Sequence, residues 1–433
     1  MEARIVIRNA VVPGLGPGSA VVVEGVRIAA LLGPGQPIDP RPGDWDVDAD
    51  GRLVTAGLVD CHAHLALGAL SRLAGLPGRA PASLSDLRLG FRRRLEDRAG
   101  PEELEPLARA GALAALRGGA TTAFDLVLGR PGAAGEALEA VARGVSAVGL
   151  RASLSFGSRG AEGAAEVEAG AVFARARAGD PRLRGCPGLD GVAEASEAAL
   201  EAAAAHVPAL GLHASVGEDE GDLAHAFQRF GARPVEVLAA RKLLGPRTVV
   251  AHAGTAIQGE GLALAESQSL LAVAPRAAML WGAPLPPLLP FAALGVRIGF
   301  GTGGLFPDLA CEAVAALMAH RQAERNASAG AGLVARVAFP AAARLASETF
   351  GAEIGGLVEG AAADLLVVDW RPPLPLPDVA EADLTLLWAG APIAWAIVGG
   401  EVRLREGRLL GADEAEIAAR AREAAGRLLR SGG

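Results

Sequence analysis

Two histidines that stand one residue apart, His62 and His64, carry the first chemical signal in the sequence. They lie within residues 53–68 (LVTAGLVDCHAHLALG), directly after an apolar run. In a β-strand the side chains of residues i and i+2 share one face, so both imidazoles would point to one spot. Converging imidazoles at the end of a buried strand are typical of a metal site. A hydrogen-bonded histidine pair at a strand end is the alternative, which the spacing alone leaves open.

Other polar residues stand where later apolar runs end. His213 and Ser215 lie in the fifth run and are followed by Glu218, and His252 ends the sixth run. Residues 301–304 (GTGG) follow the eighth run. If these runs are parallel strands of a barrel, their carboxyl ends meet at one face, where the chemistry of such barrels takes place. Four histidines at three strand ends therefore favour a metal centre over isolated hydrogen-bonded residues.

The elements that would position these residues are short apolar runs that alternate with long stretches rich in Ala, Leu, Glu and Arg. The predicted strands are residues 58–64, 121–128, 150–156, 183–189, 210–216, 248–252, 269–273 and 296–301. The predicted helices between them include residues 101–116, 195–205, 224–230 and 310–325. This alternation is typical of βα units around a parallel sheet, and eight strands predict an α/β fold with a (β/α)8 TIM-like barrel.

Short strands also precede and follow the predicted barrel. They are expected within residues 4–10, 20–31, 364–369, 394–398 and 401–404, and residues 413–430 have the composition of a helix. We expect the two ends of the chain to pack together as a small composite β-sandwich. The predicted domains are therefore residues 1–55 plus 355–433, which include the C-terminal helix, and the barrel of residues 56–354.

Composition restricts the partners and the location. The net charge is -8, and acidic residues are interspersed with arginines without a basic stripe, so we expect no nucleic-acid partner. The three cysteines are odd in number and far apart, which fits a cytoplasmic protein without a disulfide framework. Neither a signal segment nor a membrane span is expected, since the apolar stretch 384–398 is short and contains Pro392. The expected partner is a small-molecule substrate or ligand, and a homodimer stays open.

The order of these motifs resembles the amidohydrolase superfamily, and within it the branch of cytosine deaminases, guanine deaminases and chlorohydrolases. The tail 353–369 (EIGGLVEGAAADLLVVD) looks like the C-terminal strand signature of that branch. The stretch from Glu218, through Phe230-Gly231-x-Arg233, to His252 looks most like the SsnA-type aminohydrolases. The resemblance covers nearly the whole chain. It implies a barrel with a composite β-sandwich, as the pattern of elements also predicts.

The resemblance implies roles for four residues. His62 and His64 match the first two ligands of one divalent metal, zinc or iron, which activates a water molecule. Glu218 matches the glutamate that moves a proton to the leaving ammonia. His252 matches the histidine that polarises the attacked group or the water. The implied reaction is the hydrolysis of a C–N bond in a small nitrogen compound.

The sequence departs from the family pattern at the remaining site positions. Ser215 stands three residues before Glu218, where the family has its third ligand, a histidine. Gly303 stands where the family has its fourth ligand, an aspartate. Pro187 replaces a histidine often used for substrate, and Ala277-Ala278 replaces a Ser-Asn pair. We therefore expect a site poor in metal, in which hydrolysis is weak or lost.

Three residues are candidates for a compensating ligand besides His252: His213, Asp308 and Asp125. His213 is about 6–7 Å from the Ser215 position along the strand, so it would need a backbone shift to replace that ligand. Two hypotheses follow. The chain is a metal-dependent aminohydrolase or deaminase, or it is a degenerate relative with an incomplete metal site that binds a ligand or partner without hydrolysis.

Overall fold

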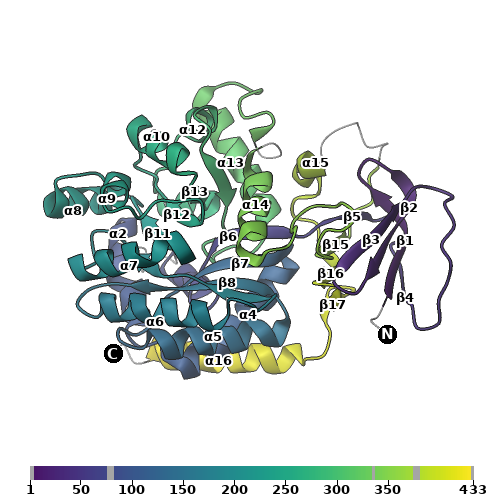
Figure 1. The fold of residues 1–433 in the computed structure, drawn as a ribbon, viewed down its shortest axis with the longest axis horizontal. Coiled ribbons are helices and arrows are strands. Elements are labelled where there is room, and N and C mark those ends of the chain that lie inside the picture. The colour runs from purple at the N-terminus through teal and green to yellow at the C-terminus, as the bar shows by residue number, and fades with distance from the viewer. Residues whose placement is uncertain (1–3, 76–81, 334–336, 374–380, 431–433) are drawn as a thin grey trace. The chain divides into compact units, whose positions relative to one another are not determined.

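The computed structural model describes residues 4–75, 82–333, 337–373 and 381–430 (Figure 1). The chain divides into two compact units. The first consists of Met1–Val59, Ala114–Thr122 and Pro307–Ala412, and the second of Asp60–Leu113, Ala123–Phe306 and Asp413–Gly433. The boundaries expected at residues 55 and 355 stay a prediction.

Eight parallel strands follow one another in the order β6-β7-β8-β10-β11-β12-β13-β14. They are β6 (Leu58–Ala63), β7 (Ala120–Val127), β8 (Arg151–Ser158), β10 (Gly188–Asp190), β11 (Leu212–Val216), β12 (Thr248–His252), β13 (Leu270–Val273) and β14 (Arg297–Phe300). After β14 the chain returns to the first strand, where the Gly303 amide donates a hydrogen bond of 2.9 Å to the His62 carbonyl. The predicted α/β fold with a TIM-like barrel is confirmed.

The prediction of one continuous fourth strand over residues 183–189 is wrong. It is divided into β9 (Leu183–Gly185), which pairs with β8, and β10, which continues the barrel. Cys186 and Pro187 separate the two pieces. Proline has no amide hydrogen and cannot donate to a neighbouring strand, although its carbonyl accepts a bond of 3.0 Å from the His213 amide. This break places Asp190, rather than Pro187, at the carboxyl end of the strand.

Helices follow most barrel strands and cover the sheet from outside (Figure 1). Before and after β7 come α1 (Gly68–Ser71), η1 (Arg72–Gly75), α2 (Leu84–Asp86), η2 (Leu87–Arg92), α3 (Arg93–Glu96), α4 (Pro101–Arg117) and α5 (Ala134–Val148). The later ones are α6 (Gly163–Ala176), α7 (Glu197–Leu210), α8 (Glu220–Phe230), α9 (Pro234–Ala240), α10 (Gln258–Ser267), α11 (Pro275–Trp281), α12 (Leu288–Ala293), α13 (Leu309–Glu324) and α14 (Phe339–Phe350).

Two local features, a helix cap before α8 and a π-helix after α2, lie in segments that contribute residues to the site. The Asp219 side chain caps α8 by accepting a bond of 3.0 Å from the Asp222 amide, so the helix begins at Glu220, two residues after Glu218. Residues 87–92 form a π-helix, η2, between α2 and α3. π-Helical turns are rare in proteins, and those that do occur are often found at functional sites.

The first unit contains a second sheet, with the strand order β18-β17-β16-β15-β5-β1-β2-β3 and β4 paired with β1. Its strands are β1 (Arg4–Val12), β2 (Gly16–Glu24), β3 (Arg27–Leu32), β4 (Trp45–Asp48), β5 (Leu53–Ala56), β15 (Leu365–Val368), β16 (Ile393–Val398), β17 (Glu401–Arg405) and β18 (Arg408–Leu409), and helix α15 (Glu381–Trp388) lies between β15 and β16. β5 and β15 join the two ends of the chain through an antiparallel pairing. Apolar residues from both ends share its core, including Ile7, Val21, Val54, Leu365 and Ile397.

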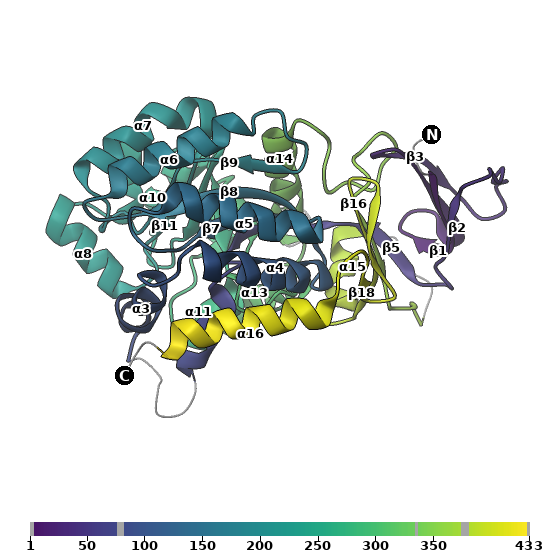
Figure 2. The same cartoon turned by 90° about the horizontal axis from the view of Figure 1, so that it is seen from below.

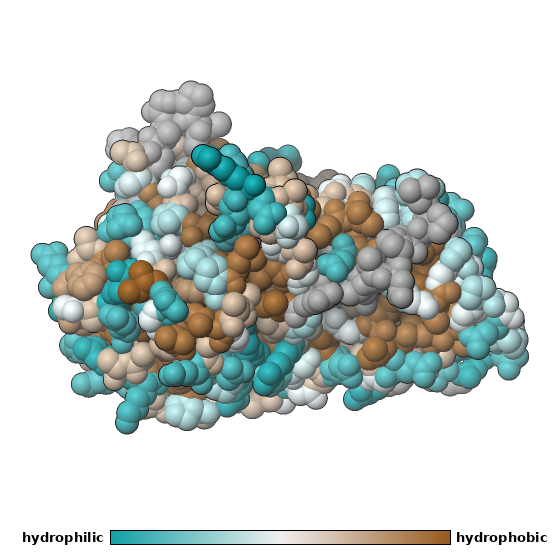
Figure 3. Space-filling view, turned by 90° about the horizontal axis from the view of Figure 1, so that it is seen from above, coloured by the Kyte–Doolittle hydropathy of each residue, from teal (hydrophilic) through white to brown (hydrophobic). Residues whose placement is uncertain are grey.

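The C-terminal helix α16 (Glu414–Arg430) belongs to the unit that contains most of the barrel strands. It lies beside α4 (Figure 2), and Arg427 donates a bond of 2.8 Å from Nε to Glu103. Among the described residues, no helix is long and apolar enough to cross a membrane. The face drawn in Figure 3 is mixed in hydropathy, with hydrophilic side chains spread over it rather than gathered in one band.

Candidate active site

The His62 and His64 side chains lie close together at the end of β6, as the spacing predicted. Their ring centroids are 4.7 Å apart. His64 Nδ1 lies 2.7 Å from the Leu126 carbonyl oxygen, which can only accept, so Nδ1 carries the proton and Nε2 is left as a free acceptor. A backbone carbonyl behind the other ring nitrogen is the usual arrangement of a metal-binding histidine. Burial lowers the pKa of His64 to about 4, which keeps the ring neutral.

His213 contacts His62 instead of taking the position of Ser215. Its Nε2 lies 2.9 Å from His62 Nδ1, and the two ring centroids are 5.1 Å apart. Both rings are buried, and burial lowers the pKa of His213 to about 3 and that of His62 well below its usual value. His62 Nε2 is buried without a hydrogen-bond partner among the described residues. His213 therefore orients His62, a function that the sequence analysis did not foresee.

His252 ends β12 in a left-handed backbone conformation, with a φ of 71°. This conformation is uncommon for residues other than glycine, and such strain is concentrated at functional sites. The His252 ring centroid lies 4.8 Å from that of His62, and its Nε2 is buried without a partner among the described residues. Burial lowers the pKa of His252, although the nearby Glu218 opposes this shift.

Glu218 lies between the end of β11 and the start of α8, fully buried. Burial would raise its pKa, but His252, Arg88 and Arg92 outweigh that effect and hold the pKa below its usual value. Arg88 Nη1 lies 3.8 Å from Glu218 Oε1. The backbone amide of Glu218 donates a bond of 3.3 Å to Asp222. The carboxylate is thus ionised and held in place.

A buried cluster of arginines and carboxylates forms one side of the site, and no motif in the sequence indicates it. Arg88 and Arg92 lie on η2, and Arg93 follows at the start of α3. Arg92 Nη2 donates a bond of 2.8 Å to Asp190, and its Nε lies 2.8 Å from Glu96. The remaining members and their pairings are Arg88 with Glu194 and Asp222, Arg93 with Asp190 and Glu194, and Arg159 with Glu96. We call these residues, together with Glu218, the arginine cluster.

The two departures from the family pattern also lie in this region. Ser215 is buried on β11, and its Oγ has no hydrogen-bond partner among the described residues. Gly303 follows β14 with a φ of 58°. A Cβ placed at Gly303 would meet only the Cβ atoms of Ala277 and Ala274, at 3.8 and 3.9 Å. Space for a side chain therefore exists at Gly303, although the sequence provides none.

The two carboxylates considered as compensating ligands have structural partners. Asp125 Oδ1 accepts a bond of 2.8 Å from the Leu65 amide, and burial raises the pKa of Asp125 to about 7. Asp308 caps α13 by accepting a bond of 3.0 Å from the Cys311 amide. A third carboxylate, Asp60, accepts a bond of 2.6 Å from the Thr302 hydroxyl and joins β6 to the segment after β14.

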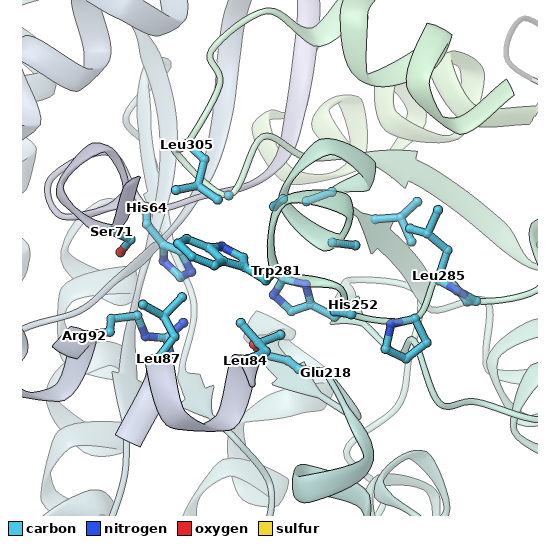
Figure 4. A pocket seen from close by; sticks show the side chains of 18 residues that line it. His64, Ser71, Leu84, Leu87, Arg92, Glu218, His252, Trp281, Leu285 and Leu305 are labelled. Carbon is cyan, nitrogen blue, oxygen red and sulfur yellow. The ribbon is translucent and has the colours of Figure 1, made fainter. Parts of the chain in front are cut away.

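One cavity brings His64, Glu218, His252 and Arg92 together, and its empty space, counted with the opening to solvent, is about 640 Å³. Figure 4 shows these side chains around the space that Trp281 and Leu87 border. The walls are apolar and include Leu84, Leu87, Val273, Trp281, Leu285 and Leu305, and Ala277 and Ala278 also lie along them. An apolar cavity with a few converging polar groups is the usual form of a small-molecule site. Its lining is suited to a mostly apolar ligand that carries a few polar groups.

The described residues fit a divalent ion at two positions. His62 and His64 are neutral, and Nε2 of His64 is free to bind a metal because its Nδ1 donates to a carbonyl oxygen. Nε2 of His62 is free in the tautomer in which its Nδ1 donates to His213. Among the residues that the structure describes, no group of three or more His, Cys, Asp or Glu side chains is arranged to hold a metal ion. The donor set is therefore preorganised at the histidine pair and incomplete at Ser215 and Gly303.

The Amidohydrolase family matches residues 53–403, and the chain belongs to this family. It is 28% identical to a 5'-deoxyadenosine deaminase of Methanosarcina acetivorans, over 99% of both chains. It is 30% identical to a 5-methylthioadenosine/S-adenosylhomocysteine deaminase of Natronomonas pharaonis, over 86% of this chain and 87% of the relative. The zinc complex of atrazine chlorohydrolase TrzN from Arthrobacter aurescens shares the fold, with a TM-score of 0.83 and 22% identity over 97% of this chain and 100% of that one.

Proposed function

We propose that the protein is an aminohydrolase that removes an amino group, as ammonia, from a small nitrogen heterocycle. The observation that carries this proposal is that Glu218, His252 and His64 line one apolar cavity in a chain of the Amidohydrolase family. The deaminase relatives support the same class of reaction. They do not favour the second hypothesis, a degenerate protein that binds a ligand without hydrolysis.

His62 and His64 would hold the divalent metal of this family. When bound, such an ion supplies an activated water molecule near neutral pH. Zinc is the ion named for the structural neighbour, while zinc or iron stays the proposal for this chain. Because a catalytic zinc normally has three protein ligands, we expect weaker binding here than in a complete cage.

The protein's own groups account for proton transfer and substrate placement. Glu218, ionised beside Arg88, would accept a proton from the attacking water and pass it to the leaving amino group. His252, neutral and held by the backbone at the end of β12, would donate to or accept from the group under attack. The apolar walls, with Trp281 at the rim of the cavity, would stack against a flat ring and exclude bulk water.

The test is ammonia release from a panel of amino-substituted purines, pyrimidines and their nucleosides. We expect Glu218→Gln to lower kcat/KM for any accepted substrate by at least a hundredfold, since proton transfer commonly contributes that much. Glu220→Gln is the matched control, because Glu220 is exposed in the first turn of α8, two residues away. The control is expected to keep the wild-type rate.

Metal analysis provides a second measurement on the purified protein. A divalent ion that is present, or that is taken up from added zinc or iron, should be absent from the double variant His62→Ala/His64→Ala. If the protein releases no ammonia from any member of the panel and takes up no metal after reconstitution, the aminohydrolase proposal is wrong. Binding of the same compounds without turnover would then favour a ligand-binding protein.

A further inference from the structure

Asp222 is a buried carboxylate in the first turn of α8, and its oxygens bind two groups that locate Glu218. Oδ2 accepts a bond of 3.3 Å from the Glu218 amide, and Oδ1 accepts one of 3.4 Å from Arg88 Nη2. The Gly217 amide also donates to Asp222. One side chain therefore holds both the backbone of Glu218 and the arginine that faces the Glu218 carboxylate.

The turn that carries Glu218 is held from its other side as well. Gly217 has a φ of 59°, a left-handed conformation that favours glycine. Its carbonyl accepts a bond of 3.1 Å from the Thr255 amide. The short segment between β11 and α8 is thus fixed through a carbonyl by Thr255 and through two amides by Asp222.

The Glu218 carboxylate depends on this support for its position. Its Oε1 has no hydrogen-bond partner among the described residues, and the same is true of Arg88 Nη1, which lies 3.8 Å away. Arg88 therefore acts on this oxygen through charge and not through a hydrogen bond. Asp222 holds Arg88 Nη2 in turn, and Glu194 lies 3.5 Å from the same nitrogen.

An aspartate at position 222 is suited to both contacts. Burial and the nearby Glu218 raise the pKa of Asp222, although Arg88 opposes this shift. An asparagine would avoid the repulsion between two carboxylates and could still accept the amide bond. Its side-chain NH2 only donates, however, and cannot pair with a guanidinium. The carboxylate provides an acceptor for each of the two groups.

We propose that Asp222 is a positioning residue, which holds Glu218 in place for proton transfer by binding the Glu218 amide and by keeping Arg88 beside the Glu218 carboxylate. This inference rests on the proposed function, since Glu218 carries the proton in that reaction. Asp222 is not among the described residues that line the cavity, so it acts on the reaction through Glu218. Its loss should lower kcat with little change in KM.

Steady-state kinetics on any accepted compound of the panel test this expectation. Asp222→Ala should lower kcat by about tenfold or more and change KM by less than about threefold, because a misplaced catalytic group slows the reaction without weakening substrate contacts. Asp222→Asn keeps an acceptor for the amide and should retain more kcat than Asp222→Ala. Arg88→Lys keeps the charge and should retain more kcat than Arg88→Met.

A double variant shows whether Asp222 acts through Glu218. Residues that work as a unit have non-additive effects, so Asp222→Ala should lower the kcat of the Glu218→Gln protein by less than about twofold. A further tenfold loss in that background, or a large rise in KM from Asp222→Ala alone, would overturn the proposal.

Glu260→Ala is the matched control. Glu260 is a buried carboxylate in the first turn of α10, where it accepts the Ile257 and Val235 amides at 3.1 and 3.0 Å and pairs with Arg233 Nε at 2.7 Å. None of these three partners is among the described residues that line the cavity. The control should lower Tm and keep kcat within about twofold. Equal losses of kcat in Glu260→Ala and Asp222→Ala would contradict a positioning role.

Hydrogen exchange of the Glu218 amide, measured on the full chain, requires no turnover. Asp222→Ala should speed this exchange by about tenfold or more, and Glu260→Ala should leave it unchanged. Unchanged exchange in Asp222→Ala would overturn the proposal. Faster exchange in a protein that releases no ammonia would contradict the aminohydrolase and uphold Asp222 as the residue that fixes Glu218. If Asp222→Ala does not fold, Asp222→Asn and the two Arg88 variants decide the outcome.

Discussion

The buried polar residues on the two sides of the cavity differ in whether they carry a charge. On the histidine side, His62, His64 and His213 are held neutral by burial, and the carboxyl groups of Asp60 and Asp125 have pKa values raised to about 7. On the arginine side, the guanidinium groups of Arg88 and Arg92 stay charged because carboxylates surround them. A charge in a poorly solvated interior is either given up or paired.

The difference indicates separate tasks for the two sides. Neutral imidazoles with free nitrogen atoms can bind a metal or take part in proton transfer, and they need no counter-ion. Among the paired arginines, Arg88 lies 3.8 Å from Glu218 and Arg92 lines the cavity. Substitutions on the two sides should therefore change the free energy of unfolding for different reasons. On the arginine side they leave a buried charge unpaired. On the histidine side they change a protonation equilibrium or remove a hydrogen bond.

The largest effect is expected on the arginine side, for Asp190→Ala. This change removes the partner of Arg92 and Arg93 and leaves buried guanidinium charge without compensation. Breaking a buried ion pair in this way costs about 3–5 kcal/mol of unfolding free energy. Urea denaturation would measure the loss. Glu139→Ala removes the exposed partner of Arg177 and should cost less than about 1 kcal/mol; equal losses would contradict the distinction.

Asp125 on the histidine side predicts a pH dependence of stability. Its folded pKa is about 7 and its ordinary value is 3.8, so the folded state holds the proton more tightly than the unfolded state. The stability that this proton provides is fully present below pH 3.8 and is lost as the pH rises through 7. The difference amounts to at most about 4 kcal/mol.

The measurement is the pH profile of the unfolding free energy between pH 4 and 8, for the wild type and for Asp125→Asn. The amide is neutral at every pH, so the variant should lose less stability over this interval than the wild type does. Parallel profiles would show that Asp125 titrates normally in the folded protein, contrary to the prediction.

Thr302→Val should cost less than either change, about 1–3 kcal/mol. The Thr302 hydroxyl donates to Asp60 and accepts from the Gly304 amide at 3.1 Å, and valine preserves the shape while leaving both groups unsatisfied. Thermal and urea unfolding would measure the effect. Thr255→Val, which removes a longer hydroxyl bond of 3.3 Å to the Gly217 carbonyl, should be milder.

Gly303→Asp is expected to have the smallest effect, and it concerns the free energy of zinc binding. The substitution should make that binding more favourable. The open space at this position admits the side chain, and Asp tolerates a left-handed backbone better than most residues do. An added carboxylate beside the histidine pair should increase zinc affinity by about tenfold or more, measured by competition with a chelator. Gly303→Asn has a similar shape without the charge and should bind zinc more weakly than Gly303→Asp. Equal affinity of the two variants would contradict an electrostatic or ligand role at this position.

The barrel and the histidine pair were predictable from the sequence because they depend on local periodicity. The HxH spacing and the apolar runs gave β6, β11 and β12 to within a few residues. The interruption of the fourth strand was not recognised, although Pro187 was its visible cause. The contact of His213 with His62 depends on how two strands are placed side by side, which spacing along one strand does not determine.

The arginine cluster was not predictable for the same reason. Arg92 and Arg93 belong to a charged segment of the kind that is usually exposed, and only the folded chain brings Asp190 and Glu194 to it, about a hundred residues away. A sequence motif identifies a site when the residues of that site are close together in the chain. The residues of the arginine cluster are far apart in the chain.

Gly303 has a further consequence, for the evolution of the site. The glycine codons GGU and GGC differ from the aspartate codons GAU and GAC by a single base, and the folded protein already has room for the larger residue. Recovery of an acidic side chain at this point would require no rearrangement of the neighbouring strands. From either of those two glycine codons, one point mutation gives a centre with an additional acidic ligand, and natural variants at this codon are a set in which to look for altered metal dependence.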